Sequence, residues 1–282
     1  MLSIHRHGGA DPTHRVSDGV HWRAMRTPDG AAALAVTPGP GLVEARAWGD
    51  GADWALAHVD SMLGVHDNPE DFVADEPLLA DLVARHGIPR FGRTTLVWDA
   101  LVPAVIEQRV TGPEAFAGFA ALVRRFGERA PGPRQDLWLQ PTPDDLARIP
   151  SWEWLRLHID PARSRPLVRA ARRAAALERT IALPGEDVES RLRSLPGIGE
   201  WTAAEVRQRA HGDPDAVSFG DYHVAKNLGW ALTGIPWNDE QMRAYLEPFR
   251  PHRARVVALV TAAAGRRPRR GPRMPPRTHL PR

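Results

Sequence analysis

Hydrophobic and polar positions alternate along the first part of the chain in the manner of β-strands. Val20–Arg26 and Leu42–Trp48 alternate, and Ala31–Thr37 between them is a short apolar run. Thr27-Pro-Asp-Gly30 and Pro38-Gly-Pro-Gly41 separate these segments and are rich in turn-forming residues. The pattern predicts an antiparallel meander of three strands, followed by a helix over Asp53–Leu63. Residues 1–18 are polar and irregular. The strands and the helix together predict a small α+β domain over residues 1–75.

From residue 76 onward, apolar positions recur every three to four residues, which indicates helices. The expected helices cover residues 78–86, 94–110, 112–129, 144–149, 151–158, 162–182, about 188–195, about 200–210, 222–232, 239–246 and 252–264. Pro103 should kink the second of these or start a new turn, since proline removes a backbone donor. The fold class is therefore mainly α: a helical domain over residues 76–265 follows the small α+β domain with its antiparallel sheet.

Two of these helices are joined by the stretch Leu195-Pro-Gly-Ile-Gly-Glu-Trp-Thr202. Pro196 and Gly197 interrupt the helical period. Gly197 and Gly199 allow positive φ angles and close approach of another molecule to the backbone. The helix that begins near Glu200 would present free N–H groups and a partial positive charge at its N-terminus. The stretch therefore predicts a phosphate site that needs no charged side chain.

Composition excludes several other classes of protein. The 282 residues include no cysteine, which rules out disulfides and Cys-ligated zinc or iron–sulfur clusters, and the 12 His are scattered without metal-ligand spacing. No run of about 18 apolar residues and no signal core is present, so we expect a cytoplasmic protein without a membrane partner. No Walker or Rossmann glycine motif appears, so no nucleotide cofactor is expected. A monomer is the default.

The positive charge is concentrated at the C-terminal end. Residues 266–282 hold seven Arg and no acid, so the remainder carries 30 basic groups (37 − 7) against 34 acidic ones. Affinity for a polyanion must then come from a local basic face and from this segment, which we expect to be a disordered basic tail. Lys226 is the only lysine in the chain.

The hairpin stretch resembles the helix-hairpin-helix of the HhH-GPD DNA glycosylase superfamily, and within it the AlkA-type 3-methyladenine glycosylases. Members carry a catalytic Asp about twenty residues after the hairpin, and Asp221 in Gly212–Lys226 matches that position. The resemblance implies a backbone grip on DNA through Gly197, Ile198 and Gly199 with the helix that includes Thr202. It further implies a monovalent cation, Na⁺ or K⁺, held by carbonyls.

The family pattern assigns further residues by position. The carbonyls that match the cation site are those of Arg193, Leu195 and Ile198. The loop that fills the gap left by a flipped base reads Gln108-Arg109 here, where the AlkA type has Gln-Leu. Lys226 lies one helical turn past Asp221, where a phosphate contact is its plainest role.

Position 201 separates two subclasses of the superfamily. Relatives that also cleave the DNA backbone have a lysine there, whose amine forms a Schiff base. This chain has Trp201, as the AlkA type does, which predicts base removal by water and no lyase step. A Tyr in the family's base pocket is replaced by Glu205, which either contacts the base or is a solvated helix residue. Tyr222 is a further candidate for the pocket.

The sequence therefore predicts a monofunctional DNA glycosylase that flips alkylated purines out of double-stranded damaged DNA, a nucleoid-associated activity. Asp221 would stabilise the positive charge that develops on the deoxyribose and orient the attacking water. Two alternatives stay open. One is a glycosylase for deaminated or mismatched bases, since the pocket is altered, and the other is a lesion-binding protein without catalysis.

Overall fold

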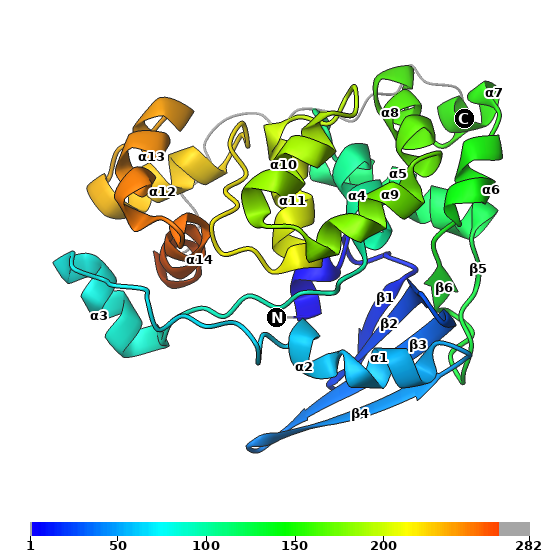
Figure 1. Cartoon of the computed structure of the whole chain (residues 1–282), viewed down its shortest axis with the longest axis horizontal. Coiled ribbons are helices and arrows are strands. Elements are labelled where there is room, and N and C mark those ends of the chain that lie inside the picture. The colour runs from blue at the N-terminus through cyan, green and yellow to red at the C-terminus, as the bar shows by residue number, and fades with distance from the viewer. Residues whose placement is uncertain (1, 265–282) are drawn as a thin grey trace.

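The computed structural model describes residues 2–264, and the basic segment 266–282 lies outside the described residues. Figure 1 shows a sheet at one end of the molecule, helices α12–α14 at the other, and the hairpin helices α10 and α11 between them. No helix in the described part is long and apolar enough to cross a membrane. The architecture confirms a mainly helical fold that opens with an antiparallel sheet.

The main sheet has four strands rather than three. They run in sequence order as β1 (His14–Ser17), β2 (Val20–Thr27), β3 (Gly30–Gly39) and β4 (Leu42–Trp48), all antiparallel. The prediction missed β1 because its residues are polar. Asp18 and Gly19 both have positive φ, and Ser17 pairs with Val20, so a two-residue hairpin turn joins β1 to β2. That Asp-Gly pair was the available signal.

Each face of the sheet is covered by a different part of the chain. On one face, Met25 and Leu34 pack with Ala55 of α1 (Ala52–Ala57) and Met62 of α2 (Val59–Met62). The expected single helix over 53–63 is thus two short helices that meet at His58. The other face packs on Leu137 and Leu139, and β6 (Trp138–Leu139) pairs with β5 (Glu128–Arg129) beside it.

The N-terminal segment is packed rather than irregular. Leu2–His5 forms a 3₁₀ turn, and the side chains of His5, His7 and His14 are buried. The pKa of His14 is lowered to about 3, mainly by burial and to a lesser extent by the positive charge of Arg23. Burial raises the pKa of Asp99 to about 6. Polar residues therefore fill the contact between the sheet and the helices. Sequence periodicity cannot show this, because the partners come from distant segments.

The helical part contains twelve α-helices within the described residues, counted from α3. They are α3 (Pro77–His86), α4 (Val97–Ile106), α5 (Gly112–Phe126), α6 (Pro143–Arg148), α7 (Ser151–Arg156), α8 (Pro161–Ala171), α9 (Ala174–Glu178), α10 (Gly185–Arg193), α11 (Glu200–Val206), α12 (Val224–Thr233), α13 (Asp239–Leu246) and α14 (Arg253–Ala264). The helix expected over 162–182 is interrupted at Arg172 and Arg173, where Arg173 leaves helical geometry. Pro103 lies inside α4, which continues past it to Ile106.

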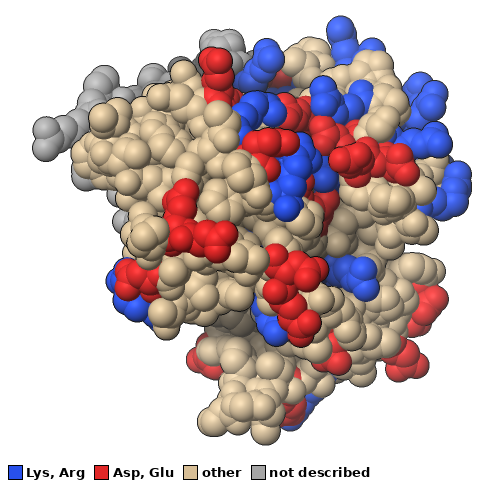
Figure 2. Space-filling view, turned by 60° about the vertical axis from the view of Figure 1, so that its left-hand side comes forward, with Lys and Arg blue, Asp and Glu red and all other residues tan. Residues whose placement is uncertain are grey.

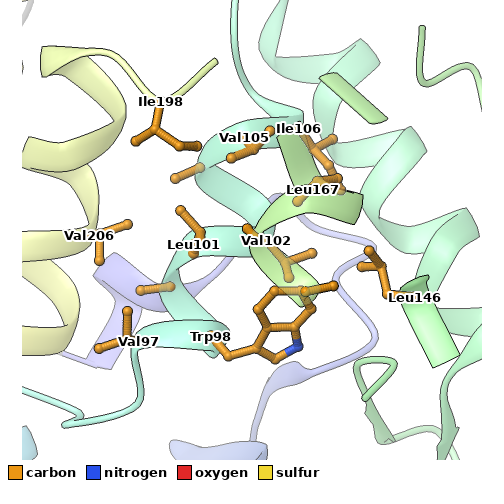
Figure 3. Packing of buried hydrophobic residues seen from close by; sticks show 14 of the residues in the cluster. Val97, Trp98, Leu101, Val102, Val105, Ile106, Leu146, Leu167, Ile198 and Val206 are labelled. Atoms are coloured by element: carbon orange, nitrogen blue, oxygen red, sulfur yellow. The ribbon is translucent and has the colours of Figure 1, made fainter. Parts of the chain in front are cut away.

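Helix α4 is the centre of the larger core. Nine of its ten residues are buried, all but Asp99, because other elements cover it on most sides. Figure 3 shows two rows of side chains on this helix. Val97, Leu101 and Val105 face the hairpin residues Ile198 and Val206, whereas Trp98, Val102 and Ile106 face Leu146 and Leu167. This packing fixes the hairpin relative to the loop that follows α4.

Candidate functional site

The turn between α10 and α11 is pressed against α8. Gly197 has a φ of 96°, and a Cβ added to it would lie 2.3 Å from Cγ of Pro166. Only glycine fits there without strain. Gly199 precedes α11 with extended backbone, and no side chain caps that helix. A Cβ on Gly199 would meet open space, so the start of α11 faces outward as the predicted phosphate site requires.

Gln108 links the loop after α4 to this turn. Its amide Nε2 donates to the carbonyl of Gly197 at 3.0 Å and to the hydroxyl of Thr202 at 2.8 Å. The side chain of Thr202 is buried, so only its backbone N–H is available for the predicted contact with DNA. Glu107, the residue before Gln108, has its Oε1 at 2.7 Å from Nδ1 of His7. The loop is thus held from two sides.

Arg109 is the residue of this loop that points away from the fold. It is exposed and adopts a positive φ of 54°, which is uncommon for a residue other than glycine. Gln108 is turned to the hairpin, and the entry of Arg109 into a gap in DNA stays a prediction. Gln108 itself, expected in that role beside Arg109, instead fixes the loop in this structure.

Asp221 lies at the start of α12 and meets the hairpin through Trp201. One carboxylate oxygen accepts from the backbone N–H groups of His223 at 2.7 Å and Val224 at 3.0 Å. The other accepts from the indole Nε1 of Trp201 at 3.3 Å. The helix N-terminus stabilises a carboxylate placed there. Two residues that are 20 positions apart in sequence therefore form one half-buried pair.

Two further candidates for the base pocket have different surroundings. Tyr222 is 72% exposed, and the Lys226 ammonium lies 3.4 Å from the centre of its ring. Glu205 is buried and bonds to Arg209 at 2.6 Å and to the hydroxyl of Ser218. The interpretation of Glu205 as a solvated helix residue is wrong, because both carboxylate oxygens have partners inside the fold.

The carbonyls expected at the cation site lie in the same turn. The Leu195 carbonyl accepts from the Ile198 N–H at 3.0 Å, and the Ile198 side chain is buried in the core. Arg193 ends α10, and its guanidinium bonds to Glu189. A Na⁺ or K⁺ held by the carbonyls of Arg193, Leu195 and Ile198 stays a prediction.

Basic side chains flank the hairpin. Arg165 and Arg169 are exposed on α8, either side of the Pro166 that contacts Gly197, and Arg169 reaches the Pro196 carbonyl at 3.5 Å. Figure 2 shows Lys and Arg gathered along the upper right of the molecule, with acidic side chains nearer the middle. On the face that Figure 2 shows, positive charge is thus gathered toward one side.

The sequence is similar to that of a curated DNA repair protein. No family model matches the chain. A probable bifunctional transcriptional activator/DNA repair enzyme AlkA of Mycobacterium tuberculosis is 27% identical over 250 residues, which cover 85% of this chain and 49% of that protein. The chain thus spans about half the length of the curated relatives it matches.

Two solved structures share the fold. A 3-methyladenine DNA glycosylase from Archaeoglobus fulgidus has a TM-score of 0.71 and 21% identity, covering 88% of both chains. A Clostridium acetobutylicum 8-oxoguanine glycosylase/lyase bound to double-stranded DNA has a TM-score of 0.68 and 13% identity, covering 93% of this chain and 91% of that one. The chain is therefore similar in sequence to a probable AlkA protein and shares the fold of these two DNA glycosylases.

Proposed function

We propose that this protein is a DNA N-glycosylase that removes alkylated purines by hydrolysis. The observation that carries the proposal is the position of Asp221, held at the start of α12 and hydrogen-bonded to Trp201 of the hairpin. A protein that only bound DNA would gain nothing from a carboxylate beside the phosphate backbone, since like charges repel. The similarity to a DNA repair enzyme supports the same activity.

Each part of the arrangement has a role in the reaction. The backbone N–H groups at Gly197 and Gly199 and at the start of α11 bind a phosphate beside the lesion. Arg109 fills the place of the flipped nucleotide, and Trp201 stacks on the electron-poor alkylated base. Asp221 stabilises the charge that develops on the deoxyribose and orients water toward its anomeric carbon. The alkylated base leaves as a neutral purine, so it needs little help from a general acid.

The absence of a lysine at position 201 supports hydrolysis without strand cleavage. Lys226 is the only amine side chain in the chain, and it rests on the Tyr222 ring. A Schiff base needs a free amine at the sugar. We therefore expect borohydride to trap no covalent complex between the protein and DNA that contains an abasic site. Trapping that disappears in Lys226→Ala would contradict the monofunctional assignment.

Base release from methylated duplex DNA tests the activity, with Asp221→Asn measured beside the wild type. The side-chain oxygen of asparagine can accept the same hydrogen bonds from the N–H groups of His223 and Val224, so the variant keeps the start of α12 in place and removes only the charge. We expect release of 3-methyladenine or 7-methylguanine to fall by about 100-fold or more, as for other groups that stabilise charge in a transition state. Affinity for abasic-analogue DNA should be retained. A variant as active as the wild type would refute the role of Asp221.

The altered pocket defines the second candidate, a glycosylase for deaminated or mismatched bases. Glu205 stands where the family has an aromatic, and it is bound to Arg209 and Ser218. If methylated DNA yields no free base while binding is retained, duplexes with deaminated and mismatched bases are the next substrates. No release from any of them would favour a protein that binds lesions without catalysis.

A further inference from the structure

The exposed face of α12 carries an unusual set of side chains. Its inner face, with Ala225, Leu228 and Gly229, is buried against the neighbouring helices. Lys226 and Trp230 of α12 and Tyr222, two residues before the helix begins, are spaced four residues apart, and we call these three the α12 stripe. Tyr222 is 72% exposed and Trp230 is 41% exposed. A solvated helix face usually carries charges, whereas this one carries two large aromatics around the chain's single lysine.

The stripe is continuous with the proposed active site. Tyr222 follows Asp221 directly, and the Asp221 carboxylate is bound by the first N–H groups of the same helix. The Lys226 ammonium, 3.4 Å from the Tyr222 ring centre, fixes these two side chains against each other. Tyr222 lies in the turn before α12 and Trp230 lies within the helix, so the stripe extends from the turn that holds Asp221 along α12.

We propose that the α12 stripe binds unpaired nucleotides of the lesion strand next to the flipped base. This inference rests on the proposed function. Aromatic side chains stack on bases without regard to sequence, and a lysine between them neutralises a phosphate. In a fully paired duplex the neighbouring bases stack on each other and are not available to Tyr222 and Trp230. The protein should then prefer a lesion flanked on one side by unpaired nucleotides.

Binding to three DNAs tests the preference. Each carries the same abasic analogue: one with paired flanks, one with three unpaired nucleotides on the 5′ side and one with three on the 3′ side. Stacking on one base is worth about 5-fold to 150-fold in affinity. We expect the wild type to bind one of the unpaired forms about 10-fold tighter than the paired form. Trp230→Ala should remove that gain and leave affinity for the paired form within about two-fold.

Trp152→Ala is the matched control, because Trp152 is also exposed and lies on α7, which Figure 1 shows at the opposite end of the molecule from α12. It should bind all three DNAs as the wild type does. Lys226→Ala should lower the slope of log affinity against log salt by about 1, as expected for one lost phosphate contact. Arg85→Ala on α3, a surface residue paired with Asp81, should leave the slope unchanged.

Two results would overturn the proposal: a wild type without preference for either unpaired form, or a Trp230→Ala variant that binds like Trp152→Ala. The stripe would then face a protein partner or solvent. Abasic-analogue binding needs no turnover, so it is independent of the proposed activity. If Asp221-dependent base release is found and the preference is not, only this inference fails. If the preference is found without base release, only the glycosylase proposal fails.

Discussion

Asp67→Asn should destabilise the protein strongly, because it removes the counter-charge of a fully buried arginine. Arg255 of α14 has no exposed surface, and its Nη1 and Nη2 each lie 2.8 Å from an oxygen of Asp67. Asp67 also accepts from the Phe91 N–H at 2.9 Å. The pair ties the segment between the sheet and α4 to the last described helix. The substitution keeps the size of the side chain and leaves a guanidinium buried without its partner.

The cost of breaking one side of a buried ion pair is about 3–5 kcal/mol. Equilibrium unfolding in urea, followed by tryptophan fluorescence, measures it directly. Asp81→Asn is the control, since the Asp81–Arg85 pair is more than half exposed and should change stability by less than about 1 kcal/mol. If Asp67→Asn costs less than about 1 kcal/mol, Arg255 finds other compensation and the reasoning is refuted.

The same pair predicts a dependence on pH. Burial alone would raise the pKa of Asp67, but hydrogen bonds from Arg255 and the Phe91 N–H outweigh it and lower the pKa below 3.8. A carboxylate with a lowered pKa stabilises the fold above its unfolded pKa, and this contribution is lost as pH falls through the folded value. The difference between wild type and Asp67→Asn should therefore be full at pH 7 and shrink below about pH 4.

Three other substitutions test the site and its surroundings. Gly197→Ala should lower the free energy of unfolding by about 1–3 kcal/mol and weaken binding to abasic DNA, because the new Cβ meets Pro166 at a positive φ. Gly199→Ala is the control: open space surrounds that position, so stability should change by less than about 1 kcal/mol. Gln108→Leu removes two hydrogen bonds to the hairpin, each worth about 0.5–1.5 kcal/mol, and should slow single-turnover base release by about 10-fold; an unchanged rate would show that the link is not needed. Burial lowers the pKa of His211 to about 4. As pH falls below 6.5, the imidazole is therefore protonated in the unfolded state before it is protonated in the folded state, and the fold loses stability. His211→Asn should flatten the change in unfolding free energy between about pH 7 and pH 5.

Local signals explain what the sequence predicted well. The hairpin depends on Pro196, Gly197 and Gly199, whose backbone preferences act over a few residues. The amphipathic helices after residue 76 follow from period alone, and most were placed within a few residues of their observed ends. Asp221 and Trp201 were each matched to a position of the family pattern, and their hydrogen bond came only with the structure. In each case the information lies close together in the chain.

Long-range contacts explain what the sequence did not predict. His7 is buried because Glu107, 100 residues away, bonds to it, and nothing near His7 announces this. The amide of Gln108 meets Gly197 and Thr202 about 90 residues further on, which the sequence did not show, and a contact from Gln108 to DNA stays a prediction. Such partners depend on how α4 packs against the hairpin. The hydrophobic periodicity of one segment carries no information on which distant segment packs against it.

Glu205 shows how an altered pocket residue acquires a positioning role. Its carboxylate accepts from the Ser218 hydroxyl and binds Arg209, and Arg209 in turn donates to the Ile4 carbonyl at 3.3 Å. The Ser218 carbonyl accepts from the Asp221 N–H at 3.2 Å. Glu205 thus joins the N-terminal segment to the turn that presents Asp221. These contacts fix the turn from inside the fold, and they leave Trp201 as the aromatic that we propose stacks on the base.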